Sequence, residues 1–256
     1  MLLAINANNT NTVFAVWEGD RLHGAWRIST DIQRTADEYV VWLDHLLNLN
    51  GLARGRISGS IIASVVPEAN FNLVKLCRDY CAATPLIVGE ASVTLGMKAL
   101  VDRPEEVGAD RLINSIAVHD RYPGAAIVVD FGTATTFDVV DADGNYRGGV
   151  IAPGINLSLH ALEAAAAKLP AVQIGRVEKV IGTNTVACMQ SGIFWGYVGL
   201  IEGLVTRIKD EFGAPMRVIA TGGHAPLFEH ATPLIETIDA TLTLWGLRLA
   251  YARSTP

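Results

Sequence analysis

Cysteines, charged residues and long apolar runs are all scarce in this sequence. Of its 256 residues, 3 are cysteine and 18% are charged, with a net charge of −6. So small and odd a number of cysteines does not form the disulfide framework of a small secreted protein, which indicates a reducing cytoplasm. The modest, acidic charge argues against nucleic acid as the main partner.

No run of about 18 apolar residues occurs, so the sequence predicts no membrane span. The segment Met1–Asn6 lacks a basic stretch and enters a predicted strand directly, so we expect no signal peptide. Cys77 and Cys81 lie four residues apart on a predicted helix, but no second His or Cys pair accompanies them. The histidines are scattered without ligand spacing, so no metal site of this kind is predicted.

Hydrophobic residues are abundant, at 50% of the chain, which is enough for one large domain or two small ones. The segment Ala126–Val140 begins as a β-branched apolar run, breaks at Asp130–Thr133 and resumes as a second strand. The two runs are too close for a crossover helix, which predicts a β-hairpin. Its tip carries a carboxylate, a glycine and small hydroxyls, which suit a cation and a phosphate. The alternative is an ordinary polar turn.

The N-terminal segment Leu3–Val16 repeats this design 124 residues earlier. The aligned pairs are Asn6 with Asp130, Asn8 with Gly132, Thr12 with Thr136 and Gly24 with Gly148. A repeat of this length predicts two copies of one β/α unit, with a ligand cleft between them.

Periodicity and turn residues predict the other elements. After the first hairpin we expect a strand at 21–27, a helix from the cap Thr35 to 49, a strand at 57–66, a helix at 68–82 and a strand at 85–88. After the second hairpin we expect a strand at 145–151, helices at 155–169 and 185–212, a strand at 216–221 and a closing helix at 240–250.

Several further stretches carry a resemblance to a known family. They are Pro104–Arg111, Gly148–Gly154, Ile181–Thr185 with Gln190–Gly192, Ala220–Gly223 and Asp239–Leu247. Together with the two hairpins, they make the chain resemble the type III pantothenate kinases of the acetate-kinase, sugar-kinase, heat-shock-70 and actin superfamily. The motifs cover the chain from end to end, in the order of that family.

This resemblance implies an α/β fold of two duplicated ribonuclease-H-like domains with mixed sheets. The first actin-like domain would comprise residues 1–117 with the closing helix 241–256, and the second residues 118–240. The implied activity is phosphorylation of the 4′-hydroxyl of pantothenate by ATP, the first step of coenzyme A biosynthesis. The implied cofactors are Mg²⁺ with ATP and K⁺ or NH₄⁺, and the implied assembly is a homodimer.

The resemblance also implies a set of site residues. The first ATP phosphate loop would be Asn6, Ala7, Asn8, Asn9, Thr10, Asn11, Thr12 and Val13, with Thr133 as a second ATP contact. Pantothenate would be bound by Val101, Gly108, Ala109, Asp110, Arg111 and Thr185, the last completed by the dimer partner. Asp110 would be the general base, and Asp130 a ligand of the monovalent cation.

The residues themselves support part of this assignment. A primary alcohol that attacks a phosphate needs a carboxylate to take its proton, and Asp110 can do so. The neighbouring Arg111 is expected to keep Asp110 ionised and to bind the substrate carboxylate in a bidentate manner. The alternative is a surface Asp–Arg pair at the start of a helix. Gly222 and Gly223 suit the adenosine end of the nucleotide, or a plain strand-to-helix turn.

The chain departs from the family pattern at three positions. Asn6 replaces the expected Asp and Asn8 the expected Gly, and Val101 stands where many members have Tyr. Asn6 loses the charge that helps to hold hydrated Mg²⁺, whereas Asn8 tolerates a left-handed backbone better than most residues. A non-catalytic pantothenate- or nucleotide-binding regulatory protein is therefore the alternative function. A related sugar or acetate kinase is opposed by the Gly108–Arg111 match.

Overall fold

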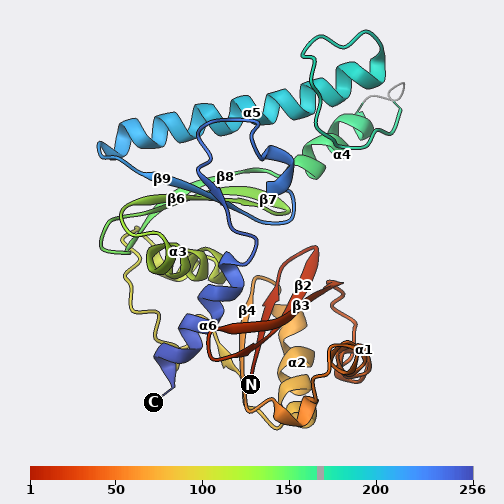
Figure 1. Cartoon of the computed structure of the whole chain (residues 1–256), viewed down its shortest axis with the longest axis vertical. Helices are drawn as coiled ribbons and strands as arrows, with labels where there is room; N and C mark the ends of the chain where they lie inside the picture. Colours follow the sequence, from red (N-terminus) through yellow and green to blue (C-terminus); the bar gives the residue numbers. More distant parts are fainter. Residues whose placement is uncertain (166–169, 256) are drawn as a thin grey trace. The chain divides into compact units, whose positions relative to one another are not determined.

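The computed structural model describes residues 1–165 and 170–255, and the chain divides into two compact units. The first unit comprises Met1–Ala117 and the chain from Leu242 onward, and the second comprises Val118–Thr241. Each unit contains one five-stranded mixed sheet (Figure 1). Within the described residues, no helix has both the length and the apolar character needed to span a membrane.

The sheet of the first unit has the strand order β3-β2-β1-β4-β5. The strands are β1 (Leu2–Ala7), β2 (Asn11–Glu18), β3 (Arg21–Ser29), β4 (Gly59–Ser64) and β5 (Leu86–Ile87). The first three strands are antiparallel neighbours, whereas β4 runs parallel to β1 and β5 runs parallel to β4. The helices are α1 (Ala36–Leu49), α2 (Pro67–Lys75), α3 (Ala109–Arg121) and α6 (Leu242–Ser254), with short helical turns η1 (Arg54–Arg56), η2 (Leu76–Tyr80) and η3 (Pro104–Glu106).

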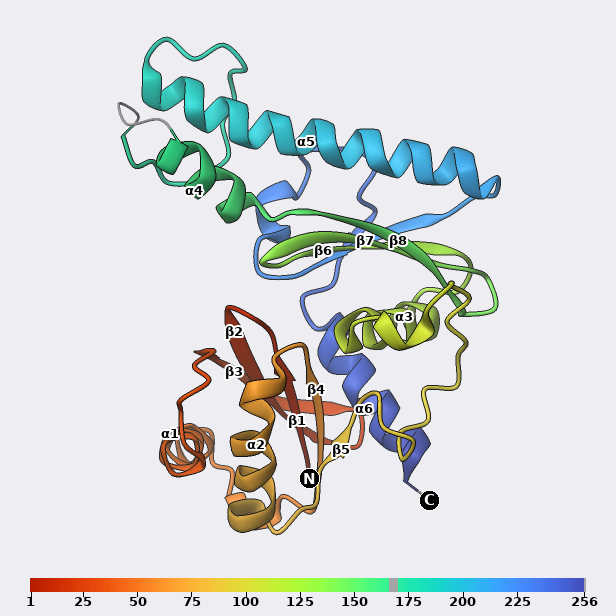
Figure 2. The same cartoon turned by 180° about the vertical axis from the view of Figure 1, so that it is seen from behind.

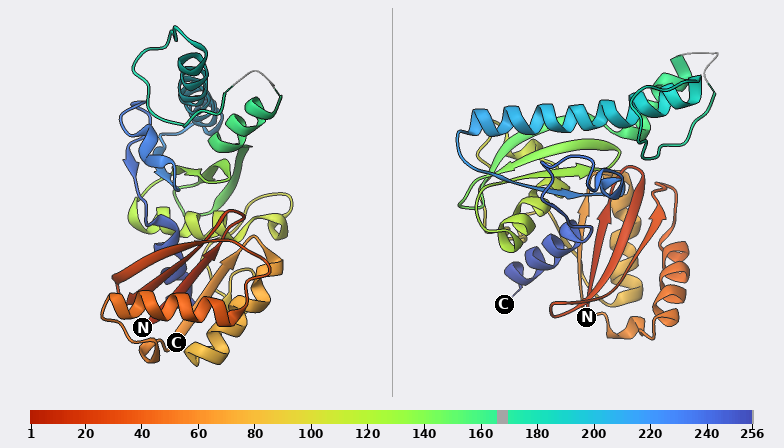
Figure 3. Two further views of the ribbon diagram at one scale, coloured as in Figure 1. Left: turned by 90° about the vertical axis from the view of Figure 1, so that its right-hand side faces the viewer. Right: turned by 45° about the horizontal axis from the view of Figure 1, so that its top comes forward.

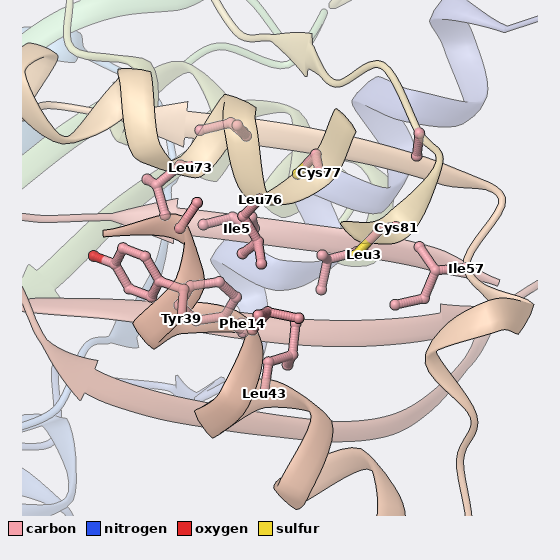
Figure 4. Close-up of a cluster of buried hydrophobic side chains, with 14 of the residues drawn as sticks. Leu3, Ile5, Phe14, Tyr39, Leu43, Ile57, Leu73, Leu76, Cys77 and Cys81 are labelled. Carbon is pink, nitrogen blue, oxygen red and sulfur yellow. The ribbon is translucent and has the colours of Figure 1, made fainter. Parts of the chain in front are cut away.

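Both faces of this sheet are buried at β1, whose six residues are all buried. Leu3 and Ile5 pack on one face with side chains of α1 and α2, among them Tyr39 and Leu73 (Figure 4). Figure 3 shows these two helices beside the strands. Successive strand side chains point to opposite faces, so Leu2 and Ala4 join a separate cluster with residues of α3 and α6. Asn6, two residues after Ala4, lies on the same face of β1 as Leu2 and Ala4.

The predicted cap of α1 is confirmed. The Thr35 hydroxyl accepts the N–H of Glu38 at 3.3 Å, and the Glu38 carboxylate accepts the N–H of Thr35 at 2.8 Å. The helix predicted at 68–82 exists, but it changes to a π-helical turn at η2. Cys77 and Cys81 are buried there as free thiols, and burial raises the pKa of Cys77 to about 12.

The sheet of the second unit has the order β10-β9-β6-β7-β8. Its strands are β6 (Ala126–Phe131), β7 (Ala134–Val140), β8 (Tyr146–Pro153), β9 (Arg217–Thr221) and β10 (Thr237–Ile238), and its helices are α4 (Ile155–Ala165), α5 (Thr185–Phe212) and the short η4 (Ala225–Phe228). The helix α5 covers one face of this sheet through Phe194, Tyr197 and Ile201 (Figure 2). The predicted helix 155–169 is confirmed to Ala165, and residues 166–169 lie outside the described residues.

The duplication is confirmed, because the two sheets share one strand order, but their hairpin loops differ in length. Ala7 pairs with Thr12 in the first hairpin, whereas Phe131 pairs with Thr135 in the second. The second loop is therefore one residue shorter. The alignment of Thr12 with Thr136 is wrong, and Thr135 is the equivalent residue. Thr12 and Thr135 are both fully buried at the base of their loops.

Candidate active site

The loop between β1 and β2 is held by backbone and hydroxyl hydrogen bonds. The N–H of Asn8 donates to Asn11 O at 3.1 Å, and the N–H of Thr30 donates to Thr10 O at 3.0 Å. The hydroxyl of Thr30 donates to Asn8 O at 2.6 Å and lies 2.9 Å from the Thr12 hydroxyl. Thr30 thus fixes the predicted phosphate loop. No motif in the sequence marks Thr30; the signal for this role is its position directly after β3, the neighbour of β2.

Two side chains of this loop end in polar atoms without a partner. Asn6 is 6% exposed, and the Oδ1 atoms of Asn6 and Asn8 are buried with no hydrogen bond to the described residues. Among those residues, only Ala82 and His230 are non-glycines with positive φ, so Asn8 does not use a left-handed backbone. Gly132 does not use one either. The explanation of Asn8 by left-handed tolerance is therefore wrong, and Asn8 does not strain the loop.

The predicted base lies in the first turn of α3. Asp110 Oδ1 accepts the backbone N–H of Arg111 at 2.9 Å. A Cβ on Gly108 would lie 2.6 Å from the same oxygen, so glycine is needed for the carboxylate to fold over the helix start. Burial raises the pKa of Asp110 above its usual range, and the hydrogen bond and charge of Arg111 oppose this only in part. Arg111 favours the ionised form of Asp110, as expected, but burial outweighs it in setting the direction of the pKa.

The first unit brings this turn close to the first loop through Val65. The N–H of Val65 donates to the carbonyl oxygen of Ala7, the last residue of β1, at 3.0 Å. A Cβ on Gly108 would lie 3.8 Å from the Val65 side chain. Asn6 and the buried residues of α3 also belong to the same face of the sheet. The predicted base therefore lies at the end of β1 that carries the predicted phosphate loop. Val101 is half-buried on the segment before η3.

The second loop places Asp130 at the end of β6, where it pairs with Thr136 of β7 and Thr221 of β9. A Cβ on Gly222 would lie 2.5 Å from Asp130 Oδ1, and Gly222 has a φ of +92°. A side chain there would displace the carboxylate, so the predicted Gly222–Gly223 turn is needed beside it.

Thr133 is exposed at the tip of the second loop, and its carbonyl accepts the N–H of Gly154 at 3.1 Å. The hydroxyl of Thr135, below the tip, is buried without a hydrogen-bond partner among the described residues. The second loop therefore exposes one hydroxyl and leaves another unsatisfied.

The Gly222–Gly223 turn also borders a cavity in the second unit. Its volume is about 440 Å³, within the range typical of small-molecule sites. Its lining combines apolar and polar side chains: Asn156, Leu159, His160, Val172, Gln173, Ile174, Gly223, His224 and Leu227. Asn156 Nδ2 lies 2.8 Å from His224 Nε2, so these two residues bridge α4 and the turn.

Thr185 is the first residue of α5 and is exposed. The helix is capped by Asn184, whose side chain accepts the N–H of Ala187 at 2.9 Å. Large apolar side chains are exposed around this end of the helix: Val180 by 63%, Ile181 by 83% and Val186 by 40%. Over the described part of the chain, no three His, Cys, Asp or Glu side chains form a group that could hold a metal ion.

Comparison with known proteins gives consistent matches. Residues 2–207 match the family model of type III pantothenate kinase. The type III pantothenate kinase of Paramagnetospirillum magneticum is 65% identical over 257 residues, covering 100% of this chain and 99% of that protein. The type III pantothenate kinase of Rhodospirillum rubrum is 60% identical over 256 residues, covering 100% of both.

Solved structures with low identity share the fold. A candidate 2-dehydro-3-deoxygalactonokinase of Sinorhizobium meliloti has a TM-score of 0.62 at 12% identity, covering 100% of this chain and 97% of that chain. A candidate Baf-family transcriptional activator of Campylobacter jejuni has a TM-score of 0.60 at 17% identity, covering 98% of both chains. The predicted α/β fold class, with two mixed sheets of a sugar-kinase type, is confirmed.

Proposed function

The chain belongs to the type III pantothenate kinase family. On that basis, we propose a role for each site residue in the phosphorylation of pantothenate by ATP, the first step of coenzyme A biosynthesis. The observation that carries the assignment of roles is the half-buried Asp110 carboxylate, folded over the start of α3 beside the end of β1. The matched relatives, which bear the kinase's name, give no support to a non-catalytic regulatory protein.

Asp110 accepts the proton of the pantothenate 4′-hydroxyl as the oxygen attacks the γ-phosphorus of ATP. Its raised pKa supports this role, because a carboxylate that holds a proton more strongly is the more effective base. Arg111 binds the pantothenate carboxylate, as a guanidinium suits a bidentate carboxylate contact. Val101, Gly108, Ala109 and Thr185 complete the pantothenate site.

The two hairpin loops contact the phosphates of ATP. In the first, Asn6 to Val13 contribute backbone N–H groups, amides and the hydroxyl network around Thr30. In the second, Thr133 presents a hydroxyl at the exposed tip. Phosphoryl transfer needs positioning and charge stabilisation more than covalent chemistry, which fits loops built from small polar groups. The cavity beside Gly223 suits the adenosine end, where apolar walls and the Asn156–His224 pair would contact the base.

Two cations complete the proposed reaction. Mg²⁺ is a hard cation that prefers oxygen ligands, and the first loop, Asn6 to Val13, offers neutral oxygens but no carboxylate. The residues therefore fit Mg²⁺ that arrives on the ATP phosphates, where it neutralises their charge. Asp130 is a half-buried carboxylate at the end of β6, which fits K⁺ or NH₄⁺.

A coupled assay of ADP release with ATP, Mg²⁺ and pantothenate tests this function. Turnover should require pantothenate, and K⁺ or NH₄⁺ should raise it over Na⁺. Asp130→Asn should raise the K⁺ concentration for half-maximal turnover by about tenfold, since removing one charge–charge contact costs roughly 1–2 kcal/mol. Absence of pantothenate-dependent ADP release in the parent would refute the function. An unchanged K⁺ response in the variant would refute only the role of Asp130.

We also propose a homodimer formed through α5. Gly192, Gly196 and Gly199 lie on the exposed side of this helix, and a Cβ on any of them would meet nothing within 4 Å. Each glycine inside a helix costs about 1 kcal/mol relative to alanine, a cost that close contact with a second helix would offset. The same helix begins at Thr185, among exposed apolar side chains.

The three free cysteines support a reducing cytoplasm as the location of the protein.

Gly196→Arg should convert the dimer to a monomer, because a long charged side chain would separate the two helices. Light scattering after size exclusion measures the mass. Val41→Arg is the matched control, since Val41 is 72% exposed on α1 in the first unit and should leave the mass unchanged. A parent that elutes as a monomer, or a Gly196→Arg variant that remains dimeric, would show that α5 is not the interface.

A further inference from the structure

A long connection leads from β5 to the short turn η3 and carries Val101, one of the proposed pantothenate contacts. We call its residues 93–103 the strap. Exposure alternates along the strap, because the odd-numbered residues from Val93 to Val101 are half-buried and the even-numbered ones between them are exposed. Val93, Leu95 and Met97 pack against the cluster of buried side chains that α6 shares with β1. The strap therefore lies along a core that α6 helps to form.

Two consecutive residues in the last turn of α6 bind the backbone of the strap. The N–H of Thr94 donates to Ser254 Oγ at 2.8 Å. Arg253 Nη1 donates to the carbonyl oxygen of Leu95. The same guanidinium borders Gly96, where a Cβ would lie 3.4 Å from Nη1 and where φ is +70°. The last turn of α6 thus contacts three successive residues of the strap.

The first turns of α6 pack against α3, the helix whose own first turn carries the proposed base. The Thr243 hydroxyl donates to Asn114 Oδ1 at 2.7 Å. A Cβ on Gly246 would lie 2.2 Å from the carbonyl oxygen of Ile113, so the backbones of the two helices approach closely at this point. One helix therefore contacts both segments that bear the proposed pantothenate contacts of the first unit.

We propose that α6 positions the pantothenate site, and that Arg253 and Ser254 are positioning residues that fix the strap and with it Val101. The inference rests on the proposed function, because it takes the strap and the start of α3 as the two walls of that site. An anchored strap is already ordered when pantothenate arrives, whereas a loose one would lose conformational freedom on binding, which weakens affinity. The phosphate loops are held by other bonds, among them those of Thr30 and Gly154, so the effect should concern pantothenate and not ATP.

The assay of pantothenate-dependent ADP release tests this proposal with Arg253→Ala, a change at an exposed residue that should leave the fold intact. The KM for pantothenate should rise about fivefold, as for the loss of one hydrogen bond from a charged donor at the surface. The kcat and the KM for ATP should stay within about twofold of the parent, since only binding of one substrate is affected. Arg253→Lys should restore most of the parental KM, because an ammonium can also donate to one carbonyl oxygen. Ser254→Ala should act in the same direction but less, because its bond joins neutral groups.

Arg248→Ala is the matched control on the same helix. The Arg248 guanidinium donates to the carbonyl oxygen of Gly19 at 2.9 Å and to the Asp20 carboxylate, in the turn between β2 and β3. This variant removes comparable bonds of α6 away from the strap. Its melting temperature should fall at least as far as that of Arg253→Ala, while its KM for pantothenate stays parental.

Limited digestion with trypsin gives a second readout that does not depend on activity. Lys98 is an exposed residue of the strap and a site for this protease. Cleavage after Lys98 should be several-fold faster in Arg253→Ala than in the parent or in Arg248→Ala, because a released segment reaches the extended form that proteases bind more often. Pantothenate should slow this cleavage in the parent.

A parental KM for pantothenate in Arg253→Ala, or cleavage after Lys98 at the parental rate, would overturn the inference and leave the kinase function standing. An equal rise in the KM values for pantothenate and ATP would also overturn it, since the anchor would then support the first unit as a whole. Absence of pantothenate-dependent ADP release in the parent would refute the proposed function, and the inference with it.

Discussion

Asp110→Asn should lower kcat by about 10²–10⁴-fold, the range by which a positioned general base accelerates proton transfer. The Asn amide can still accept the N–H of Arg111, which Asp110 Oδ1 accepts at 2.9 Å, so the turn at Gly108 keeps its geometry. The KM for pantothenate should change much less than kcat, because Arg111 remains to bind the substrate carboxylate. The coupled ADP-release assay measures both constants.

The same substitution should not destabilise the protein at neutral pH. Burial raises the pKa of Asp110, so the charged form is the unfavourable one in the folded state. The stability contributed by such a group is fully present below its unfolded pKa and is lost as the pH rises through its folded pKa. Asn removes the buried charge, so its melting temperature at pH 7 should equal or exceed that of the parent. This advantage should shrink as the pH falls towards the unfolded pKa.

The pH profile gives a second readout for Asp110. The base must be deprotonated, so kcat/KM should fall on the acidic side at a pH above about 3.9, the usual aspartate pKa. Asp143→Asn, an exposed turn residue of the second unit, is the matched control and should keep the parent's kcat and profile. Retention of parental kcat in Asp110→Asn would contradict its role as base; a large loss of stability would contradict the burial argument.

The fold was largely predictable because short-range sequence patterns determine most of its helices and strands. Apolar runs broken by short polar segments predict both hairpins, and Thr35 with Glu38 predicts the cap of α1. The two-residue strand β10 was not predicted, because it consists only of Thr237 and Ile238 and exists through its pairing with β9. The strand predicted at 57–66 is shortened to β4, because only its central residues pair with β1. Strand pairing of this kind depends on tertiary contacts that local patterns do not contain.

The candidate site was predictable in residue identity but not in environment. The sequence shows that Arg111 follows Asp110, but not that burial outweighs the arginine in setting the pKa. Thr12 was aligned with Thr136 instead of its structural equivalent Thr135. Because these two threonines are adjacent, the alignment does not reveal that the second loop is one residue shorter. The role of Thr30 depends on bonds to residues about twenty positions earlier. These features arise from three-dimensional packing around a motif that the sequence alone identifies.

Gly154→Ala should disturb the second phosphate loop, although Gly154 lies outside it. A Cβ on Gly154 would lie 2.0 Å from Thr133 O and 2.8 Å from Gly132 O, and backbone atoms cannot rotate away. The same residue donates its N–H to Thr133 O, and its own carbonyl accepts the N–H of Ser158 at the start of α4. Displacement of the loop should therefore accompany a loss of about 1–3 kcal/mol in the free energy of unfolding, as overpacking usually costs.

Gly154→Ala should also impair the use of ATP as a substrate. If Thr133 contacts the ATP phosphates as proposed, kcat/KM for ATP should fall by about tenfold or more in Gly154→Ala, as for the loss of one or two charge-assisted hydrogen bonds. Gly132→Ala is the structural control: its Cβ would have ordinary contacts of 3.5 and 3.8 Å, and its φ is not positive. Urea unfolding should show little change in Gly132→Ala and a clear loss in Gly154→Ala. Equal stability of the two variants would mean that Gly154 does not support the loop, and the fall in kcat/KM would then need another cause.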